Sequence, residues 1–167
     1  LLGNPALLMR DEYRELWGDI PIVLCSEENY LGPQETYTKK QAIATADRTP
    51  LTQLADPYNM VLLYSNLYLD ENIQLICHIV PEIKKFIFIG DARQINQTNN
   101  LDIRNKLKKT HPNVEYQFIT PQDMTTNQLL DSLYFVDPKT TGVLFSSWFY
   151  KTTFAGNTSL VSNAHKL

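Results

Sequence analysis

The chain has 167 residues, of which 43% are hydrophobic and 20% are charged, and its formal net charge is −3 at pH 7. This composition is typical of a folded chain of one domain or slightly more, and it disfavours intrinsic disorder. Because the balance is acidic and no basic run exceeds two residues, nucleic-acid binding is disfavoured. No window approaches the ~18 apolar residues of a membrane span. The chain begins with Leu1 rather than Met, so we expect a piece of a longer protein.

Two regular elements are predicted before residue 30. Apolar residues recur at helical spacing over residues 6–17, which indicates a helix. The apolar run at residues 22–25 then predicts a short buried strand, and a polar loop with Asn29 and Tyr30 follows it. We interpret residues 1–30 as the end of a first lobe.

Residues 31–58 show no clear periodicity, and three X–Pro pairs interrupt them. An irregular stretch of roughly 25 residues is uncommon inside a compact domain. We therefore interpret this segment as a crossover, or linker, between two lobes. The alternative is a mobile surface loop with some local helix around residues 39–46.

Residues 59–167 are predicted to form a second lobe in which strands and helices alternate. The continuous apolar run at residues 86–89 is typical of a strand buried on both faces, as in a parallel sheet between helices. Asn99 and Asp102 have the spacing of a capping box, which would open a helix. The predicted elements are strands at residues 60–64, 86–89, 114–118 and 142–147, and helices at residues 69–80, at 99–109, from Asp123 or Thr125 onward, and from Asn157 to a cut at Leu167.

This alternation predicts an α/β fold with a doubly wound, mainly parallel sheet and helices on both faces, in a Rossmann-like arrangement. The carboxyl ends of such strands lie at one edge, where ligands bind. Polar and aromatic residues gather at the predicted strand ends, including Ser26, Glu28, Asn29, Tyr30, Tyr64, Asp91, Arg93, Ser146, Ser147 and Trp148. As a set they favour a small-ligand cleft, although any exposed loop is polar.

Motifs for catalysis or cofactor binding are missing from the sequence. It lacks GxGxxG, GxxxxGK[ST] and GxSxG, and its three histidines are dispersed. We therefore predict no cofactor, no metal and no enzymatic activity for this piece. Cys25 and Cys77 lack the spacing of metal ligands, and we interpret both as buried free thiols. A disulfide or a two-cysteine metal site is the alternative.

Three passages carry a family resemblance. They are IPIVLCSEENY (20–30), NMVLLYSNLYLDENIQLICHIVPEIKKFIFIGD (59–91) and VEYQFITPQDMTTNQLLDSLYFVDPKTTGVLFSSWFY (114–150). Their order resembles the type I periplasmic-binding-protein fold, in the ABC-transporter substrate-binding-like branch, which includes sensor domains of bacterial two-component hybrid histidine kinases. The most specific likeness is a helix ending in Ile79-Val80-Pro81-Glu82, followed by two lysines, an apolar strand and Asp91.

The resemblance implies two α/β lobes with a small ligand between them, and this chain is too short for two complete lobes. The function that it implies is a periplasmic sensor domain that signals by lobe closure to a membrane-linked histidine kinase. Its partners would be an unidentified small molecule and a second copy in a receptor homodimer, with the membrane reached only through the full-length receptor. The ligand-binding positions that it implies are Asn29, Tyr30, Tyr64, Asp91, Ser147 and Trp148.

Three alternatives remain open. A solute-binding protein of an ABC transporter would share the fold and the ligand chemistry. An α/β enzyme would need a paired acid and base in one crevice. A structural dimerisation module would bury the strand-end aromatic residues against a second copy.

Overall fold

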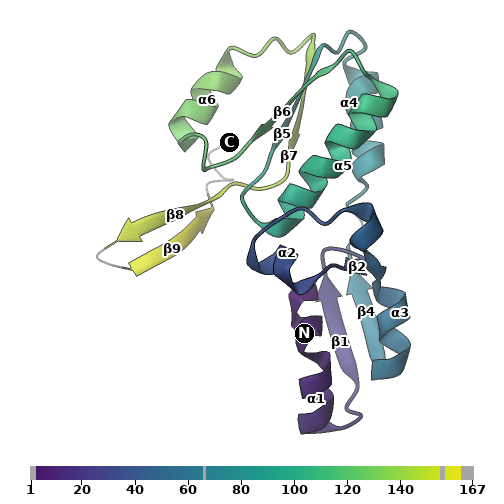
Figure 1. Cartoon of the computed structure of the whole chain (residues 1–167). Helices are drawn as coiled ribbons and strands as arrows, with labels where there is room; N and C mark the ends of the chain where they lie inside the picture. Colours follow the sequence, from purple (N-terminus) through teal and green to yellow (C-terminus); the bar gives the residue numbers. More distant parts are fainter. Residues whose placement is uncertain (1–2, 66, 155–156, 163–167) are drawn as a thin grey trace. The chain divides into compact units, whose positions relative to one another are not determined.

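The computed structural model describes residues 3–65, 67–154 and 157–162. The chain divides into two compact units, Leu1–Tyr68 and Leu69–Leu167 (Figure 1). Each unit combines helices with a sheet of parallel strands. The predicted mixed α/β class is therefore confirmed.

The first unit contains a two-stranded parallel sheet with short helices around it. Strand β1 (Ile22–Ser26) pairs with β4 (Met60–Tyr64), so that Ile22 lies opposite Met60. The short strands β2 (Tyr30–Leu31) and β3 (Thr49–Pro50) pair antiparallel. The helical elements are η1 (Asn4–Met9), α1 (Arg10–Trp17), α2 (Gln34–Thr38), η2 (Thr45–Asp47), α3 (Leu51–Ala55) and η3 (Asp56–Tyr58).

The core of the first unit lies on one face of the β1–β4 sheet. Leu24 is fully buried there and packs with Leu7, Leu31 and Leu51. The opposite face is open: the side chains of Val61 and Leu63 are 57% and 55% exposed. Cys25 is also exposed. Residues 22–25 form the predicted strand, but the prediction that it is buried is wrong for the face that carries Cys25, and so is the predicted burial of the Cys25 thiol.

The predicted crossover at residues 31–58 contains more regular structure than its sequence indicated. The structure places α2 at Gln34–Thr38, before the local helix expected around residues 39–46, and η2 at Thr45–Asp47, which overlaps the end of that segment. The units also divide after Tyr68 rather than after residue 58, because β4 pairs with β1 in the first unit.

The second unit is built on three parallel strands in the order β6-β5-β7. Strand β5 is central, and its Phe88 lies opposite Phe118 of β6 and Leu144 of β7. The elements are α4 (Leu69–Ile79), β5 (Lys85–Ile89), α5 (Gln94–Thr110), β6 (Glu115–Ile119), α6 (Thr126–Tyr134), β7 (Thr141–Phe145), β8 (Phe149–Phe154) and β9 (Asn157–Ser162).

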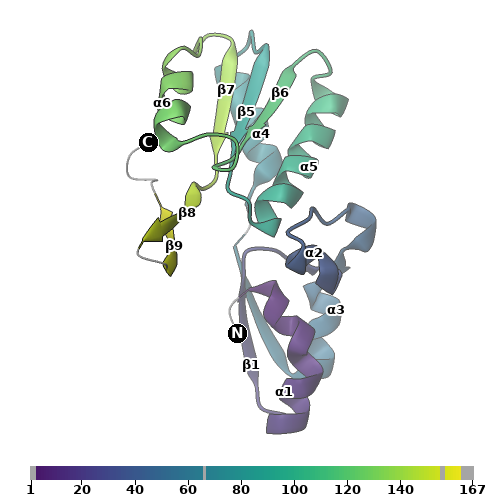
Figure 2. The same cartoon turned by 60° about the vertical axis from the view of Figure 1, so that its left-hand side comes forward.

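Helices cover both faces of this sheet (Figure 2). On one face, Phe86 and Phe88 pack with Ile73 of α4 and Ile103 of α5. On the other, Ile87 and Ile89 of β5 pack with α6 residues, among which Leu129 is fully buried. The predicted two-sided burial of the β5 strand is confirmed.

Three local predictions in the second unit have clear outcomes. The helix expected from Asp123 or Thr125 onward is confirmed as α6, and its N-cap is Thr125, whose hydroxyl accepts from the Gln128 backbone N–H. The helix expected to open at Asn99 begins instead at Gln94, because the polar residues 94–100 hide its periodicity. The helix expected from Asn157 is wrong over the described residues, where β9 pairs antiparallel with β8. This segment is rich in Thr and Ser, and Thr favours strands. Residues 163–167 lie outside the described residues.

Among the described residues, no helix is both long enough and apolar enough to span a bilayer.

Candidate functional site

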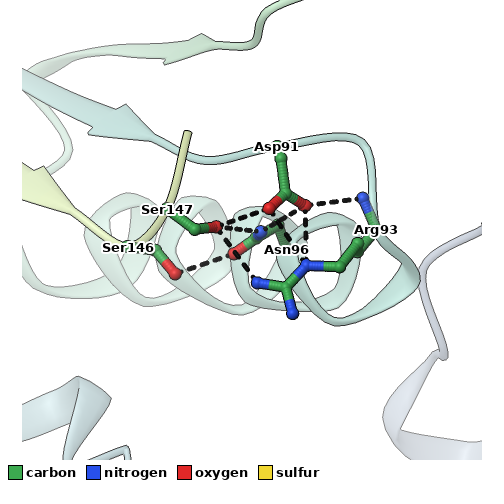
Figure 3. Close-up of polar contacts among 5 residues, drawn as sticks. All are labelled: Asp91, Arg93, Asn96, Ser146 and Ser147. Atoms are coloured by element: carbon green, nitrogen blue, oxygen red, sulfur yellow. Dashed lines mark hydrogen bonds and ion pairs between the residues drawn. The ribbon is translucent and has the colours of Figure 1, made fainter. Parts of the chain in front are cut away.

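Five polar residues meet at the carboxyl edge of the β6-β5-β7 sheet (Figure 3). Two loops and one helix position them. Asp91 and Arg93 follow β5, and Ser146 and Ser147 follow β7, while Asn96 lies in the first turn of α5. Because β5 and β7 are parallel neighbours, their carboxyl ends bring side chains together that are more than 50 positions apart in the sequence, such as Asp91 and Ser147.

The Asp91 carboxylate is the centre of this network and is only 1% exposed. Its Oδ1 accepts from the Arg93 backbone N–H at 2.8 Å and from Asn96 Nδ2 at 2.9 Å. Its Oδ2 accepts from the Ser147 hydroxyl at 2.7 Å. The Arg93 Nε lies 3.1 and 3.0 Å from the two oxygens. Both carboxylate oxygens are therefore satisfied by donors of the protein, as burial of a charged group requires.

Asn96 and the two serines complete the network. Asn96 is fully buried, and its Nδ2 also donates to Ser147 Oγ at 2.9 Å. Its Oδ1 accepts from the Ser146 hydroxyl at 2.9 Å. Gly90 makes room for this arrangement, because a Cβ at Gly90 would lie 3.0 Å from Asn96 Cγ. The amide of Asn96 thus ties the loop after β5 to the loop after β7.

Arg93 is the part of the network that reaches solvent. Its side chain is 47% exposed although that of Asp91 is buried. The guanidinium lies 5.1 Å from the centroid of the Phe149 ring, a cation–π distance. Its Nη2 lies 3.3 Å from Ser147 Oγ. A buried carboxylate, a serine and an aromatic ring therefore fix the orientation of an exposed cation.

Of the six predicted ligand positions, Asp91 and Ser147 are brought together. Trp148 is next to them in sequence, but its side chain is 1% exposed and lies in the core cluster with Ile87 and Leu129. Its indole N–H donates to Thr126 Oγ1 at 3.0 Å. The structure places Trp148 in the core rather than at an open surface.

The other three positions belong to the first unit. Asn29 is exposed, and its backbone carbonyl accepts from the Leu51 N–H. The Tyr30 hydroxyl donates to Glu28 Oε1 at 2.6 Å, and the Arg48 guanidinium lies 4.7 Å from the centre of its ring. Tyr64 ends β4 and is exposed. Tyr30 therefore packs against its own loop.

A second polar cluster follows β1, and it serves a different purpose. The Asn4 amide donates to the backbone carbonyls of Glu28 and Tyr30. The Ser26 hydroxyl donates to the Glu28 carbonyl at 2.6 Å and accepts from the Glu28 N–H at 2.9 Å. Because these side chains satisfy backbone groups of one loop, the cluster fixes the loop after β1.

The network residue that the sequence reasoning missed is Asn96. Arg93 and Ser146 belong to the set of strand-end residues, but they were not among the six ligand positions. Asn96 lies within the segment Gln94 to Asn100, which is polar except for Ile95 and gave no signal of a helix or of burial. Its one available signal is its place five residues after Asp91, in the first turn of the following helix.

The described part of the chain does not bring together three or more His, Cys, Asp or Glu side chains that could hold a metal ion. Cys25 and Cys77 are both free thiols. A separate cavity of about 200 Å³ lies in the first unit, and Tyr13, Trp17 and Tyr58 are among its lining residues. It contains none of the six predicted ligand positions.

No family model matches the chain, and neither a curated protein nor a solved structure matches it.

Proposed function

We propose that this chain is a non-catalytic ligand-binding domain, and that a small molecule binds at the carboxyl edge of the β6-β5-β7 sheet. The observation that supports this most is the network in which buried Asp91 holds exposed Arg93 at that edge. Open α/β sheets bind ligands outside the carboxyl ends of their strands. A rigid polar group beside an aromatic ring is typical of a small-ligand site.

The contacts of Asp91 favour binding over proton transfer. A general base must reach the proton that it abstracts from a substrate. Asp91 is buried, and its oxygens accept from Arg93, Asn96 and Ser147. Its role in this proposal is to position Arg93.

The finer proposal is a periplasmic sensor domain of a two-component histidine kinase, with the type I periplasmic-binding-protein fold. The parallel sheets and the strand order of the second unit are compatible with one lobe of that fold. A ligand that binds the closed state more tightly would shift the population toward it and so signal. A solute-binding protein of an ABC transporter is the runner-up. Kinase regions encoded in the same gene would favour the sensor, and a lipoprotein signal alone would favour the transporter.

One observation favours an enzyme as a second candidate, namely the 2.7 Å hydrogen bond between Ser147 Oγ and Asp91 Oδ2. A serine nucleophile usually needs a histidine base within hydrogen-bond reach. Of the described histidines, His78 lies near the end of α4 and His111 follows α5, which has 17 residues and begins at this edge. A helix of that length places His111 about 25 Å away, and His78 precedes the amino end of β5. The third, His165, lies outside the described residues.

A thermal-shift screen of the whole chain tests the proposal. The panel contains sugars, amino acids, nucleosides and small aromatic compounds. A ligand at one hundred times its Kd should add about 2.7 kcal/mol of stability. A hit should then perturb the NMR signals of residues 91–96 and 146–147 more than those of β1 and β4. Silence across the panel from a folded chain would contradict the proposal, and concentration-dependent sedimentation would then support the dimerisation module.

A further inference from the structure

We infer that the ligand carries a carboxylate and that Arg93 binds it. This inference rests on the proposed function, because it names the ligand class of the same site. The argument uses the direction of each hydrogen bond in the network and the exposure of its members.

The other polar side chains of the network donate their hydrogen bonds to one another or to Asp91. The Ser147 hydroxyl donates to Asp91 Oδ2, and the Ser146 hydroxyl donates to Asn96 Oδ1. The Asn96 amide donates to Asp91 Oδ1 and to Ser147 Oγ. An anion that approached these three side chains would therefore meet oxygen atoms, which repel it, or groups that are buried. Among the side chains of this network, Arg93 is therefore the one suited to bind an anion.

Arg93 is prepared for that task. A guanidinium carries five N–H donors in a planar fork that matches a carboxylate. Its Nε lies 3.0 Å from Asp91 Oδ2, its Nη2 lies 3.3 Å from Ser147 Oγ, and its Cζ lies over the Phe149 ring, 5.1 Å from the ring centroid. These contacts restrict the orientation of the guanidinium before a ligand arrives. Less conformational entropy is then lost on binding.

The charge balance of the site disfavours a ligand group with two negative charges. Asp91 compensates much of the charge of Arg93, so a group with two negative charges would face an uncompensated repulsion at short distance. A carboxylate carries one charge and can accept two parallel N–H bonds from the fork. The Phe149 ring beside the guanidinium favours a planar group there. An organic carboxylate therefore fits this edge better than a phosphate does.

Matched acids and amides test this inference on the whole chain. The pairs are acetate and acetamide, benzoate and benzamide, 3-phenylpropanoate and its amide, and glutamate and glutamine, with inorganic phosphate as a further probe. Titration calorimetry should show at least one acid binding ten- to hundredfold more tightly than its amide, as expected for a charge-assisted hydrogen bond. Raising the salt concentration should weaken the binding of the acid and leave the binding of the amide unchanged.

Three substitutions on or next to the same helix test the role of Arg93, and Arg104→Gln is the control. Arg93→Gln should reduce the acid-to-amide ratio to about one. Arg104→Gln, in the exposed middle of α5, should leave the ratio unchanged. Arg93→Lys keeps the charge without the fork, so we expect an intermediate ratio. Circular dichroism and the melting temperature of each variant show whether the fold is retained.

The outcomes separate the two proposals. If no acid binds more tightly than its amide, or if Arg93→Gln keeps the preference, the inference is wrong. Binding of a neutral panel compound that Arg93→Gln leaves unaffected would overturn the inference but keep the proposed function. If phosphate binds more tightly than every acid, the choice of carboxylate is wrong. If no probe and no panel compound binds the folded chain, both proposals fail.

Discussion

The two parallel sheets of this protein differ in how their faces are covered. In the second unit, Phe86, Ile87, Phe88 and Ile89 of β5 are all buried, because α4 and α5 pack on one face and α6 on the other. Among the described residues of the first unit, the core lies on one face of the β1–β4 sheet. Residues of its other face, among them Val61 and Leu63, are about half exposed.

The comparison shows what an apolar run does and does not predict. The runs IVLC in β1 and FIFI in β5 look alike in the sequence, and both predict strands of a parallel sheet. Parallel sheets are normally covered on both faces. Whether a second layer is present depends on which helices the neighbouring segments supply. The apolar run alone therefore predicts a strand that is suited to burial. It does not predict whether helices cover one face of that strand or both.

The largest expected effect comes from truncating a residue in the covered sheet. Phe88→Ala removes a buried aromatic ring and should reduce the free energy of unfolding by about 3–5 kcal/mol. Leu63→Ala, on the open face of β4, should cost less than about 1 kcal/mol, because its side chain is already half hydrated. Urea denaturation, followed by far-UV circular dichroism and by tryptophan fluorescence, measures both changes. Equal costs would show that a partner covers the β1–β4 face in solution.

Much of the fold could be predicted from sequence because periodicity and capping are local. The strands β1, β4, β5, β6 and β7 and the helices α4 and α6 lie close to their predicted positions. The start of α5 was missed because Gln94 and Thr98 are polar yet buried, and they bond to each other at 2.8 Å. When two buried polar side chains bond to each other in this way, the hydrophobic periodicity of the sequence does not reveal that they are buried.

A second prediction compares the two polar clusters that follow the sheets. Asp91→Ala leaves the buried donors of Asn96 and Ser147 without their acceptor, and should cost about 2–4 kcal/mol. Asn4→Ala removes the donor to two loop carbonyls and should cost about 1–3 kcal/mol. Hydrogen exchange measured on peptides should show the loss of protection around β5 in the first variant and around β1 in the second. Asp131→Ala, at an exposed site on α6, should leave the protection around β5 and around β1 unchanged. Loss of protection around β1 in Asp91→Ala would contradict the assignment of the clusters to separate units.

The candidate site could be predicted only in part. The rule that ligands bind at strand carboxyl ends selects Asp91 and Ser147 correctly as neighbours, because both follow parallel strands. The same rule also selects Trp148, whose indole turns into the core beneath α6. Position after a strand does not determine the direction of a side chain. That direction depends on packing between elements, which a single sequence does not reveal.

The smallest expected effect concerns the two thiols. Cys25 lies exposed in the open sheet of the first unit, while Cys77 is half-buried on α4. Burial raises the pKa of the Cys77 thiol. Iodoacetamide should therefore modify Cys25 several-fold faster than Cys77 at pH 8, because Cys25 is more accessible and the raised pKa of Cys77 lowers the thiolate fraction of that thiol. Peptide mass spectrometry after short labelling times measures the two rates.

The pH dependence of the labelling rate separates the effect of reagent access to a thiol from the effect of its ionisation. A raised pKa means that the folded state favours the neutral Cys77 thiol, so its labelling rate should still rise with pH after an exposed reference thiol has levelled off near pH 9. For the same reason, the contribution of Cys77 to stability should decrease as the pH rises above the ordinary thiol range. Any rate difference that remains at high pH reports burial by α4 packing alone. Equal rates at every pH would contradict the difference in exposure between the two thiols.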